Sequence, residues 1–226
     1  MEFAIAGSKM RHNLELDLFG GEPLMNPEVV KHVINYVRRR EFETGKNIKL
    51  TLTTNGTLLN DDIIQFLNDN RVMLVLSLDG KKETHDNMRP FPNKTGSYDA
   101  AVRGFKKVIE SRNGKNYYLR GTYTHFNPHF AEDTLDMTKI GKELSVEPVV
   151  GIDEPYVLTE ADLPVLYEEY DKLARAYLQK RREGDAFDFF HFNVALDNGP
   201  CVAKRLAGCG AGHEYFAITP EGDIYP

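Results

Sequence analysis

Apolar and polar residues alternate in several short segments of the chain, and longer segments with helical spacing lie between them. In Leu14–Phe19 the leucines stand at every second position, which is the period of a half-buried β-strand. Val72–Leu78 is almost continuously apolar, as expected of a strand that is buried on both faces. The segments predicted to be strands are Leu14–Phe19, Ile48–Thr53, Val72–Leu78, Tyr117–Thr124 and Val146–Gly151.

Helical segments separate these strands, and residues that favour helix starts precede them. Asn26 stands before Pro27, which suits the first turn of a helix, and the Thr159–Asp162 segment fits a capping box. The segments predicted to be helices are Pro27–Glu43, Asp61–Asn68, Tyr98–Ser111, Ala131–Leu144 and Glu160–Glu183. Strand–helix units in series predict an α/β fold with a parallel sheet and right-handed crossovers.

The pattern changes after Glu183. The Asp188–Phe192 segment is aromatic and extended, and Gly199–Gly212 is rich in glycine and holds both cysteines of the chain. Glu214–Tyr225 reads as strand, turn and strand, which predicts a β-hairpin. We therefore expect two domains, residues 1–190 and residues 191–226.

Composition narrows the classes of function. The formal net charge of −6 argues against a nucleic-acid partner. There is no run of 18 apolar residues, so no membrane span is expected. Two cysteines are too few for a disulfide scaffold and favour a reducing, cytoplasmic setting.

The first predicted strand runs into the Gly20–Pro23 turn, which has two glycines, a carboxylate and a proline. Glycines lack Cβ atoms, so a ligand can approach their backbone closely, and parallel α/β folds bind ligands at the carboxyl ends of strands. A tight turn without a ligand is the alternative for this segment taken alone.

Other polar residues stand at or near the ends of later strands. Asn55-Gly56 is also compatible with an ordinary turn, and Ser77 or Asp79 could merely cap the next element. Arg120 lies within a strand that we expect to be buried, so it needs an anion, either an internal carboxylate or a ligand carboxylate or phosphate.

Cys201 and Cys209 are separated by seven residues, which is not the spacing of a zinc or thioredoxin-like site. Two free thiols and shared ligation of an iron–sulfur cluster are both compatible with these residues.

Taken together, these segments resemble the radical S-adenosylmethionine (radical SAM) enzymes that carry a C-terminal SPASM domain. The Gly20–Pro23 turn resembles the segment that holds the amino group of the cofactor's methionine, and Thr53–Gly56, Ser77–Gly80 and His85–Pro90 resemble the segments that follow. The resemblance implies an incomplete parallel (β/α) partial barrel, with Leu14–Phe19 as an exposed edge, followed by the start of a SPASM/twitch-like region. It implies S-adenosylmethionine as cofactor, with Ser77 and Arg120 binding its carboxylate, and Cys201 and Cys209 as ligands of an auxiliary [4Fe–4S] cluster. The implied cofactor-binding residues are Gly20, Gly21, Glu22, Pro23, Thr54, Asn55, Ser77, Asp79 and Arg120.

Within that family the chain is most similar to maturases of six-cysteine (SCIFF) peptides, on the Glu147–Val150, Glu154–Tyr156 and Gly199–Gly212 segments. Such enzymes join a cysteine sulfur to a backbone α-carbon. The implied partners are a small, cysteine-rich precursor peptide and a reducing electron donor. Sulfatase-type maturation, which forms formylglycine, is the competing reaction.

One departure from the family is large, because the C-x-x-x-C-x-x-C triad that binds the SAM-cleaving cluster is absent. We therefore expect a fragment that lacks this segment and most of the SPASM domain, and that is inactive by itself. The alternative is a cluster-free binding module that performs no chemistry.

Overall fold

The computed structural model describes residues 1–193, 212 and 214–225. It forms two compact units, Met1–Phe190 and His191–Pro226, which are treated separately below. The identity of the second unit as the start of a SPASM region stays a prediction. No helix in the described part of the chain is long and apolar enough to cross a bilayer.

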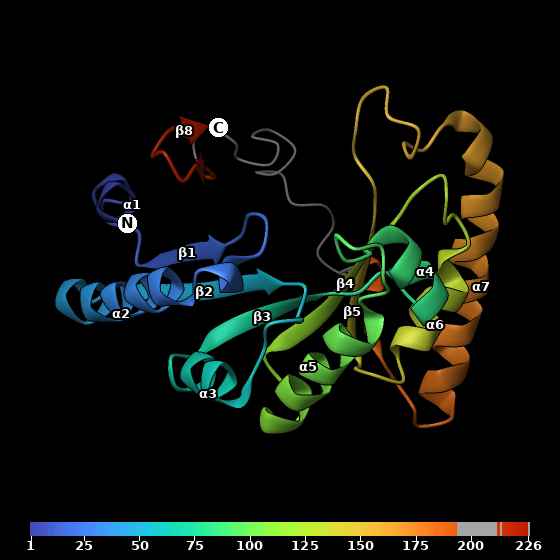
Figure 1. The fold of residues 1–226 in the computed structure, drawn as a ribbon, viewed down its shortest axis with the longest axis horizontal. Helices are drawn as coiled ribbons and strands as arrows, with labels where there is room; N and C mark the ends of the chain where they lie inside the picture. Colours follow the sequence, from blue (N-terminus) through green and yellow to red (C-terminus); the bar gives the residue numbers. More distant parts are fainter. Residues whose placement is uncertain (194–211, 213, 226) are drawn as a thin grey trace. The chain divides into compact units, whose positions relative to one another are not determined.

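The first unit is built on one six-stranded sheet in which every strand pairs in parallel with the next strand along the chain (Figure 1). This order confirms the predicted α/β fold of the radical SAM partial-barrel type, and the sheet is open. Its strands are β1 (Asn13–Leu18), β2 (Asn47–Thr54), β3 (Val72–Ser77), β4 (Tyr117–Tyr123), β5 (Glu143–Pro148) and β6 (Asp188–Phe189).

Helices connect these strands, and side chains satisfy several of their first N–H groups. Asn26 Oδ1 accepts from Val29 N at 3.4 Å, Asn60 Oδ1 accepts from Ile63 N at 2.9 Å, and the predicted capping box at Thr159 and Asp162 is present. The helices are α1 (Glu2–Gly7), η1 (Pro23–Met25), α2 (Pro27–Thr44), α3 (Asp61–Asp69), α4 (Lys82–Met88), α5 (Tyr98–Ser111), α6 (Phe130–Met137), η2 (Glu160–Asp162), α7 (Leu163–Arg182) and η3 (Phe190–Phe192).

The two faces of the sheet differ in burial. Leu50, Leu74 and Leu119 lie on the face that the helices cover, and each is 0% exposed. Thr53 and Ser77 lie on the opposite face and are half-buried, and Arg120 on that face is exposed. Because side chains alternate along a strand, the same strands supply an apolar core on one face and, toward their carboxyl ends, polar side chains on the other.

The helix and strand bounds predicted around α6 were wrong. The helix predicted over Ala131–Leu144 ends at Met137, and β5 begins at Glu143 rather than at Val146. The Met137 carbonyl accepts from both Ile140 N and Gly141 N, so the chain turns there and frees the following residues for the sheet. Leu144 and Val146 then lie in the core as strand residues.

The sequence analysis did not predict α4 as a helix or β6 as a strand of the sheet. The seven-residue helix α4 has three charged residues, Lys82, Glu83 and Asp86, and little apolar periodicity. The two-residue strand β6 aligns Asp188 with Glu143, so the aromatic segment that looked merely extended adds a sixth strand. The opposite edge of the sheet is β1, as predicted.

In the second unit, β7 (Ala217–Ile218) and β8 (Ile224–Tyr225) pair antiparallel and confirm the predicted hairpin. Thr219 N donates to the Asp223 carbonyl, and Gly222 adopts φ +95° in the turn between them. The predicted cluster ligands Cys201 and Cys209 lie outside the described residues.

Candidate functional site

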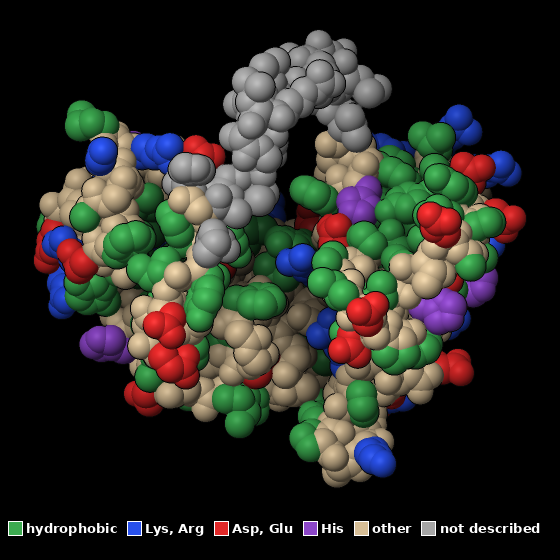
Figure 2. All heavy atoms as spheres, turned by 90° about the horizontal axis from the view of Figure 1, so that it is seen from above, with side chains coloured by type: hydrophobic (Ala, Val, Ile, Leu, Met, Phe, Trp, Pro, Cys, Tyr) green, Lys and Arg blue, Asp and Glu red, His purple; other side chains and the backbone are tan. Residues whose placement is uncertain are grey.

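A cavity of about 420 Å³ opens at the carboxyl ends of the first four strands. Figure 2 shows a hollow on the upper face of the molecule with basic side chains at its wall. Glycine, threonine, serine and arginine are the main residue types that line the cavity at the strand ends. His85 of α4 and the loop from Arg89 to Ser97 supply the rest of the lining. The lining residues are Phe19, Gly20, Gly21, Thr53, Thr54, Asn55, Thr57, Ser77, His85, Arg89, Pro90, Phe91, Pro92, Ser97, Arg120 and Thr122.

The Gly20–Gly21 backbone faces open space. A Cβ atom built on either glycine would have no neighbour within 4 Å, so packing within the described chain does not explain the missing side chains. Gly20 also adopts φ +132°, a conformation that other residues rarely take. The turn is therefore a cradle that a ligand could approach closely.

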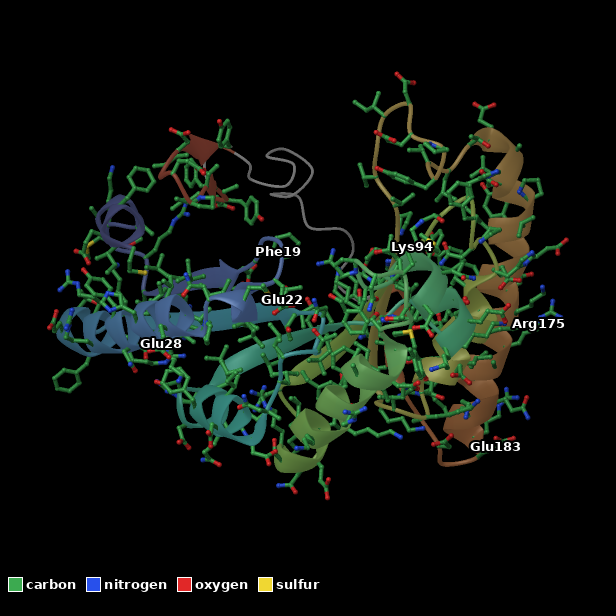
Figure 3. The ribbon with its side chains drawn as sticks, viewed as in Figure 1. Phe19, Glu22, Glu28, Lys94, Arg175 and Glu183 are labelled. Atoms are coloured by element: carbon green, nitrogen blue, oxygen red, sulfur yellow. The ribbon has the colours of Figure 1, made fainter. Side chains whose placement is uncertain are left out.

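The Glu22 carboxylate connects this turn to the end of β2 by hydrogen bonds. Its carboxylate accepts from Thr54 Oγ1 at 2.8 Å and from Asn55 N at 2.7 Å, and it also accepts from Leu24 N at 3.1 Å. Figure 3 shows Phe19 and Glu22 at the end of β1, where the chain leads toward α2. Since these contacts occupy the carboxylate, Glu22 holds two strand ends together, and Pro23 begins the following short helix η1.

Ser77 and Arg120 lie opposite each other in the register of β3 and β4, and both line the cavity. Gly21, Ser77 and Arg120 therefore line one cavity at the carboxyl ends of the strands, where a parallel sheet is expected to bind its ligands. Arg120 is exposed, however, so the expectation of a buried arginine was wrong, because its strand has one open face. Among the described residues Arg120 makes no ion pair, which leaves its guanidinium available to a ligand anion.

Asp79 does not line the cavity, and its carboxylate pairs with an arginine that the sequence did not single out. Arg89 donates to it twice, from Nε to Oδ2 at 2.6 Å and from Nη2 to Oδ1 at 3.0 Å. The Asp79 side chain is 3% exposed and also accepts from Thr122 N at 3.0 Å. Asp79 therefore holds Arg89 in the cavity wall and binds the end of β4.

His85 and Ser97 complete this wall. Asp79 N donates to His85 Nδ1 at 3.4 Å, His85 Nε2 lies 3.1 Å from Ser97 Oγ, and Ser97 Oγ donates to the Arg89 carbonyl at 2.5 Å. In this arrangement Nδ1 accepts a hydrogen bond and Nε2 donates one, as expected of a neutral imidazole with its proton on Nε2. Burial lowers the pKa of His85, which favours the same neutral form. The only signal for this network in the sequence was the His85–Pro90 segment itself.

A second hollow of about 430 Å³ lies between α6 and α7. Its walls carry Glu132, Asp136, Lys139, Lys180 and Glu183, and it includes none of the strand-end residues. Glu183 lies at the far end of α7 in Figure 3. Oppositely charged surface side chains of this kind are an ordinary solvated helix face, so we place the functional site at the strand ends.

The described residues fit one implied cofactor better than the other. S-adenosylmethionine carries the amino group and the carboxylate of an amino acid at one end. These groups suit the open Gly20–Gly21 backbone, the Ser77 hydroxyl and the Arg120 guanidinium. An iron–sulfur cluster needs thiolates, and the described part of the chain contains no cysteine. It also contains no cluster of three His, Cys, Asp or Glu side chains that could hold a metal ion.

A model of the radical SAM superfamily matches residues 9–137 of the chain. This region is more than half of the 226 residues and includes all four strand ends of the cavity. The chain belongs to the radical SAM superfamily. Membership implies S-adenosylmethionine and a [4Fe–4S] cluster as the family's cofactors.

Two relatives are sulfatase-maturating enzymes. The chain is 33% identical over 98% of its length to the cysteine-type anaerobic sulfatase-maturating enzyme of Clostridium novyi, of which it covers 60%. It is 28% identical over 75% of its length to the serine-type enzyme of Bacteroides thetaiotaomicron, of which it covers 38%. The chain thus spans less than two thirds of the length of each of these relatives.

Solved structures share the fold. Native anSMEcpe with bound AdoMet matches 84% of the chain with a TM-score of 0.70 at 18% identity, and 53% of that protein is covered. Streptococcus suis SuiB bound to its precursor peptide SuiA matches 100% of the chain with a TM-score of 0.65 at 18% identity, and 51% of that protein is covered. At this identity the likeness concerns the fold alone.

Proposed function

We propose that this chain is the S-adenosylmethionine-binding part of a maturase that modifies a ribosomally made, cysteine-rich peptide. The observation that carries the proposal is the single cavity shared by the Gly20–Gly21 cradle, Ser77 and the exposed Arg120. The sulfatase-maturating relatives and the SuiB fold support the peptide as substrate class. An electron donor is required as a further partner.

Each cavity residue has a proposed task. Arg120 binds the carboxylate of the cofactor's methionine through charge-assisted hydrogen bonds, and the Ser77 hydroxyl donates to the same group. The Gly20–Gly21 backbone lies against the amino end, where a side chain would collide with it. Glu22, Pro23, Thr54, Asn55 and Asp79 act indirectly, because they fix the turns that present these groups.

S-adenosylmethionine, when bound beside a reduced [4Fe–4S] cluster, supplies the radical that removes a hydrogen atom from the peptide. The proposed product is a thioether between a cysteine sulfur and a backbone α-carbon. One S–H and one Cα–H bond would break as the S–C bond forms. S-adenosylmethionine would take one hydrogen atom, and the remaining electron would pass to an electron carrier of the longer protein as the second hydrogen leaves as a proton, so the peptide would undergo a net two-electron oxidation. We propose that Cys201 and Cys209 bind an auxiliary cluster in a longer protein of which this chain is part.

Mass spectrometry of a precursor peptide co-expressed anaerobically with that longer protein tests the proposal. A thioether maturase yields a peptide lighter by two hydrogens for each bridge, with cysteines that resist alkylation even after reduction. An unchanged peptide together with intact S-adenosylmethionine would instead support a cluster-free binding module.

Formylglycine formation in a sulfatase is the second candidate, because both sulfatase-maturating relatives align over most of the chain. The same assay separates the two reactions when a sulfatase-derived peptide is supplied. An aldehyde at its cysteine or serine, with no bridged precursor peptide, would favour this candidate.

A further inference from the structure

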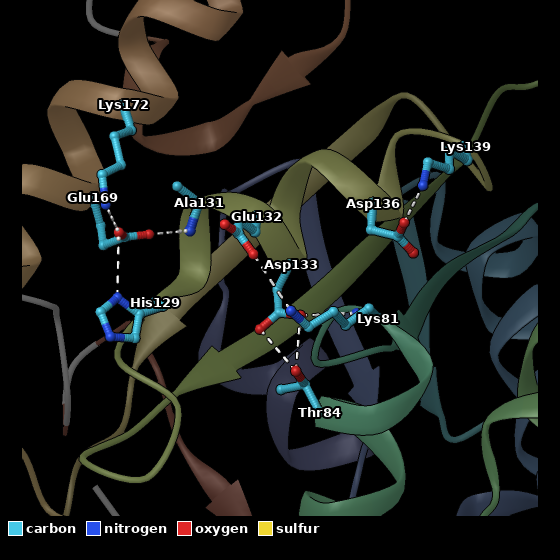
Figure 4. A network of polar contacts seen from close by, with 10 residues as sticks. All are labelled: Lys81, Thr84, His129, Ala131, Glu132, Asp133, Asp136, Lys139, Glu169 and Lys172. Carbon is cyan, nitrogen blue, oxygen red and sulfur yellow. Dashed lines mark hydrogen bonds and ion pairs between the residues drawn. The ribbon is translucent and has the colours of Figure 1, made fainter.

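Two buried carboxylates connect the outer helices to the wall of the cavity (Figure 4). Glu169 of α7 is 1% exposed and accepts from Ala131 N, at the start of α6, at 2.9 Å. Asp133 of α6 is 5% exposed and accepts from Lys81 N, at the start of α4, at 3.0 Å. Each carboxylate thus satisfies a backbone donor at the start of a helix that lies earlier in the chain.

Asp133 is the carboxylate of this pair that contacts the segment between Asp79 and His85. Its Oδ1 and Oδ2 atoms accept from Thr84 Oγ1 at 2.9 and 3.0 Å. A Cβ atom on Gly80 would lie 2.3 Å from Asp133 Cβ, so the corner at Gly80 is packed directly onto this side chain. Residue 79, next in the chain, carries the carboxylate that holds Arg89.

We propose that Asp133 is a positioning residue for the cofactor cavity. It fixes the corner from Gly80 to Thr84, and the corner fixes Asp79, which presents the Arg89 guanidinium to the cavity. The inference rests on the proposed function only in taking this cavity as the cofactor's site. A merely structural cap would stabilise α4 without changing the geometry of Arg89.

The burial of Asp133 explains why it suits this task. Loss of water raises its pKa, and the Lys81 N–H and the Thr84 hydroxyl oppose that rise by stabilising the charged form. Because its donors are fixed, the buried Asp133 carboxylate can satisfy them in only one orientation. Removing the carboxylate leaves the Lys81 N–H unpaired. The second oxygen of the carboxylate is less important, because Oδ1 accepts both bonds.

The test compares Asp133→Ala with Asp133→Asn in the full 226-residue chain, because asparagine retains one acceptor oxygen. The readout is the NMR signal of the Arg89 Nε–H, assigned with Arg89→Lys. The bidentate pair with Asp79 should make this proton slow to exchange with water in the wild type. We expect Asp133→Ala to shift and broaden the signal and Asp133→Asn to restore it.

Thr159→Ala is the matched control, because it removes the cap at the start of η2 and touches no residue of the cavity. If Asp133→Ala does not fold, Thr84→Val provides the second variant, with a smaller shift in the same direction. An Arg89 signal that is unchanged in the folded variant, or that moves equally in Thr159→Ala, would overturn the proposal.

Titration with S-adenosylhomocysteine separates this inference from the proposed function. Asp133→Ala should raise its Kd about tenfold, equivalent to 1.4 kcal/mol, and Thr159→Ala should leave it unchanged. A wild-type chain that does not bind this probe would contradict the proposed function, while the Arg89 signal would still decide the positioning role.

Discussion

At the scale of single residues, Gly21 and Gly56, which follow the ends of β1 and β2, are required for different reasons. Gly56 adopts φ +78°, and a Cβ atom there would lie 2.2 Å from Cε1 of the fully buried Phe105. Gly21 has no positive φ, and its Cβ position is open. Packing therefore restricts Gly56, whereas only a ligand would restrict Gly21.

Gly56→Ala should lower the free energy of unfolding by about 3 kcal/mol, because a strained backbone and a collision with Phe105 add together. Urea denaturation measures the loss. A change below about 0.5 kcal/mol, typical of neutral surface substitutions, would show that α5 can move aside.

Gly21→Ala should leave the urea midpoint nearly unchanged and abolish binding of S-adenosylhomocysteine, because the methyl group occupies the space proposed for the amino end of the ligand. Calorimetric titration of the folded variant measures the effect. Retained affinity would place the ligand elsewhere.

The pKa of Asp185 tests the interaction of its carboxylate with two lysines. Hydrogen bonds from Lys142 and then Lys180 lower its pKa from 3.8 to about 2. Because the folded-state pKa is the lower one, the stabilisation is present above pH 3.8 and is lost as the pH falls through about 2. Lys142→Met should raise the pKa of Asp185, as followed by carboxyl NMR, whereas Lys139→Met should not.

The residue types of the site could be found from the sequence, but their orientations could not. Gly21, Ser77 and Arg120 follow from strand ends that converge in a parallel sheet. The exposure of Arg120 and the turn of Asp79 toward Arg89 depend on which face of the sheet stays open, and that is a property of the tertiary structure.

At the scale of elements, β3 lies between β2 and β4 and carries much of the core. Leu76 is 0% exposed, so Leu76→Ala leaves a cavity that the flanking strands cannot easily fill. We expect it to lower the free energy of unfolding by about 3 kcal/mol. Leu178→Ala on α7, where the side chain is 53% exposed, should cost less than about 0.5 kcal/mol.

Equal losses in the two leucine variants, measured by urea denaturation, would contradict the assigned core. Long elements with a clear period, such as α2 and α5, were predictable to within one residue. The α6–β5 segment and the short α4 and β6 were not, because their boundaries depend on a turn at Met137 and on pairing with distant strands rather than on local pattern.

At the scale of the whole molecule, the chain has a cavity that we propose for the cofactor but only two of the thiolates that the family's chemistry needs. Two cysteines can hold at most half of the four ligands of a [4Fe–4S] cluster. Anaerobic reconstitution with iron and sulfide should therefore give little stable cluster, as judged by iron content and absorbance. Stoichiometric incorporation of a cluster would show that other residues serve as ligands.

The most direct test of the central claim is an NMR titration of the chain with S-adenosylhomocysteine. We predict shifts at Gly20–Gly21, Ser77 and Thr122, and a Kd at least about tenfold higher in Arg120→Ala, without loss of stability. Arg175→Ala is the control, because its side chain is 83% exposed on α7 and labelled far from the cavity in Figure 3. Shifts confined to other regions, or equal affinity in Arg120→Ala and Arg175→Ala, would contradict the account.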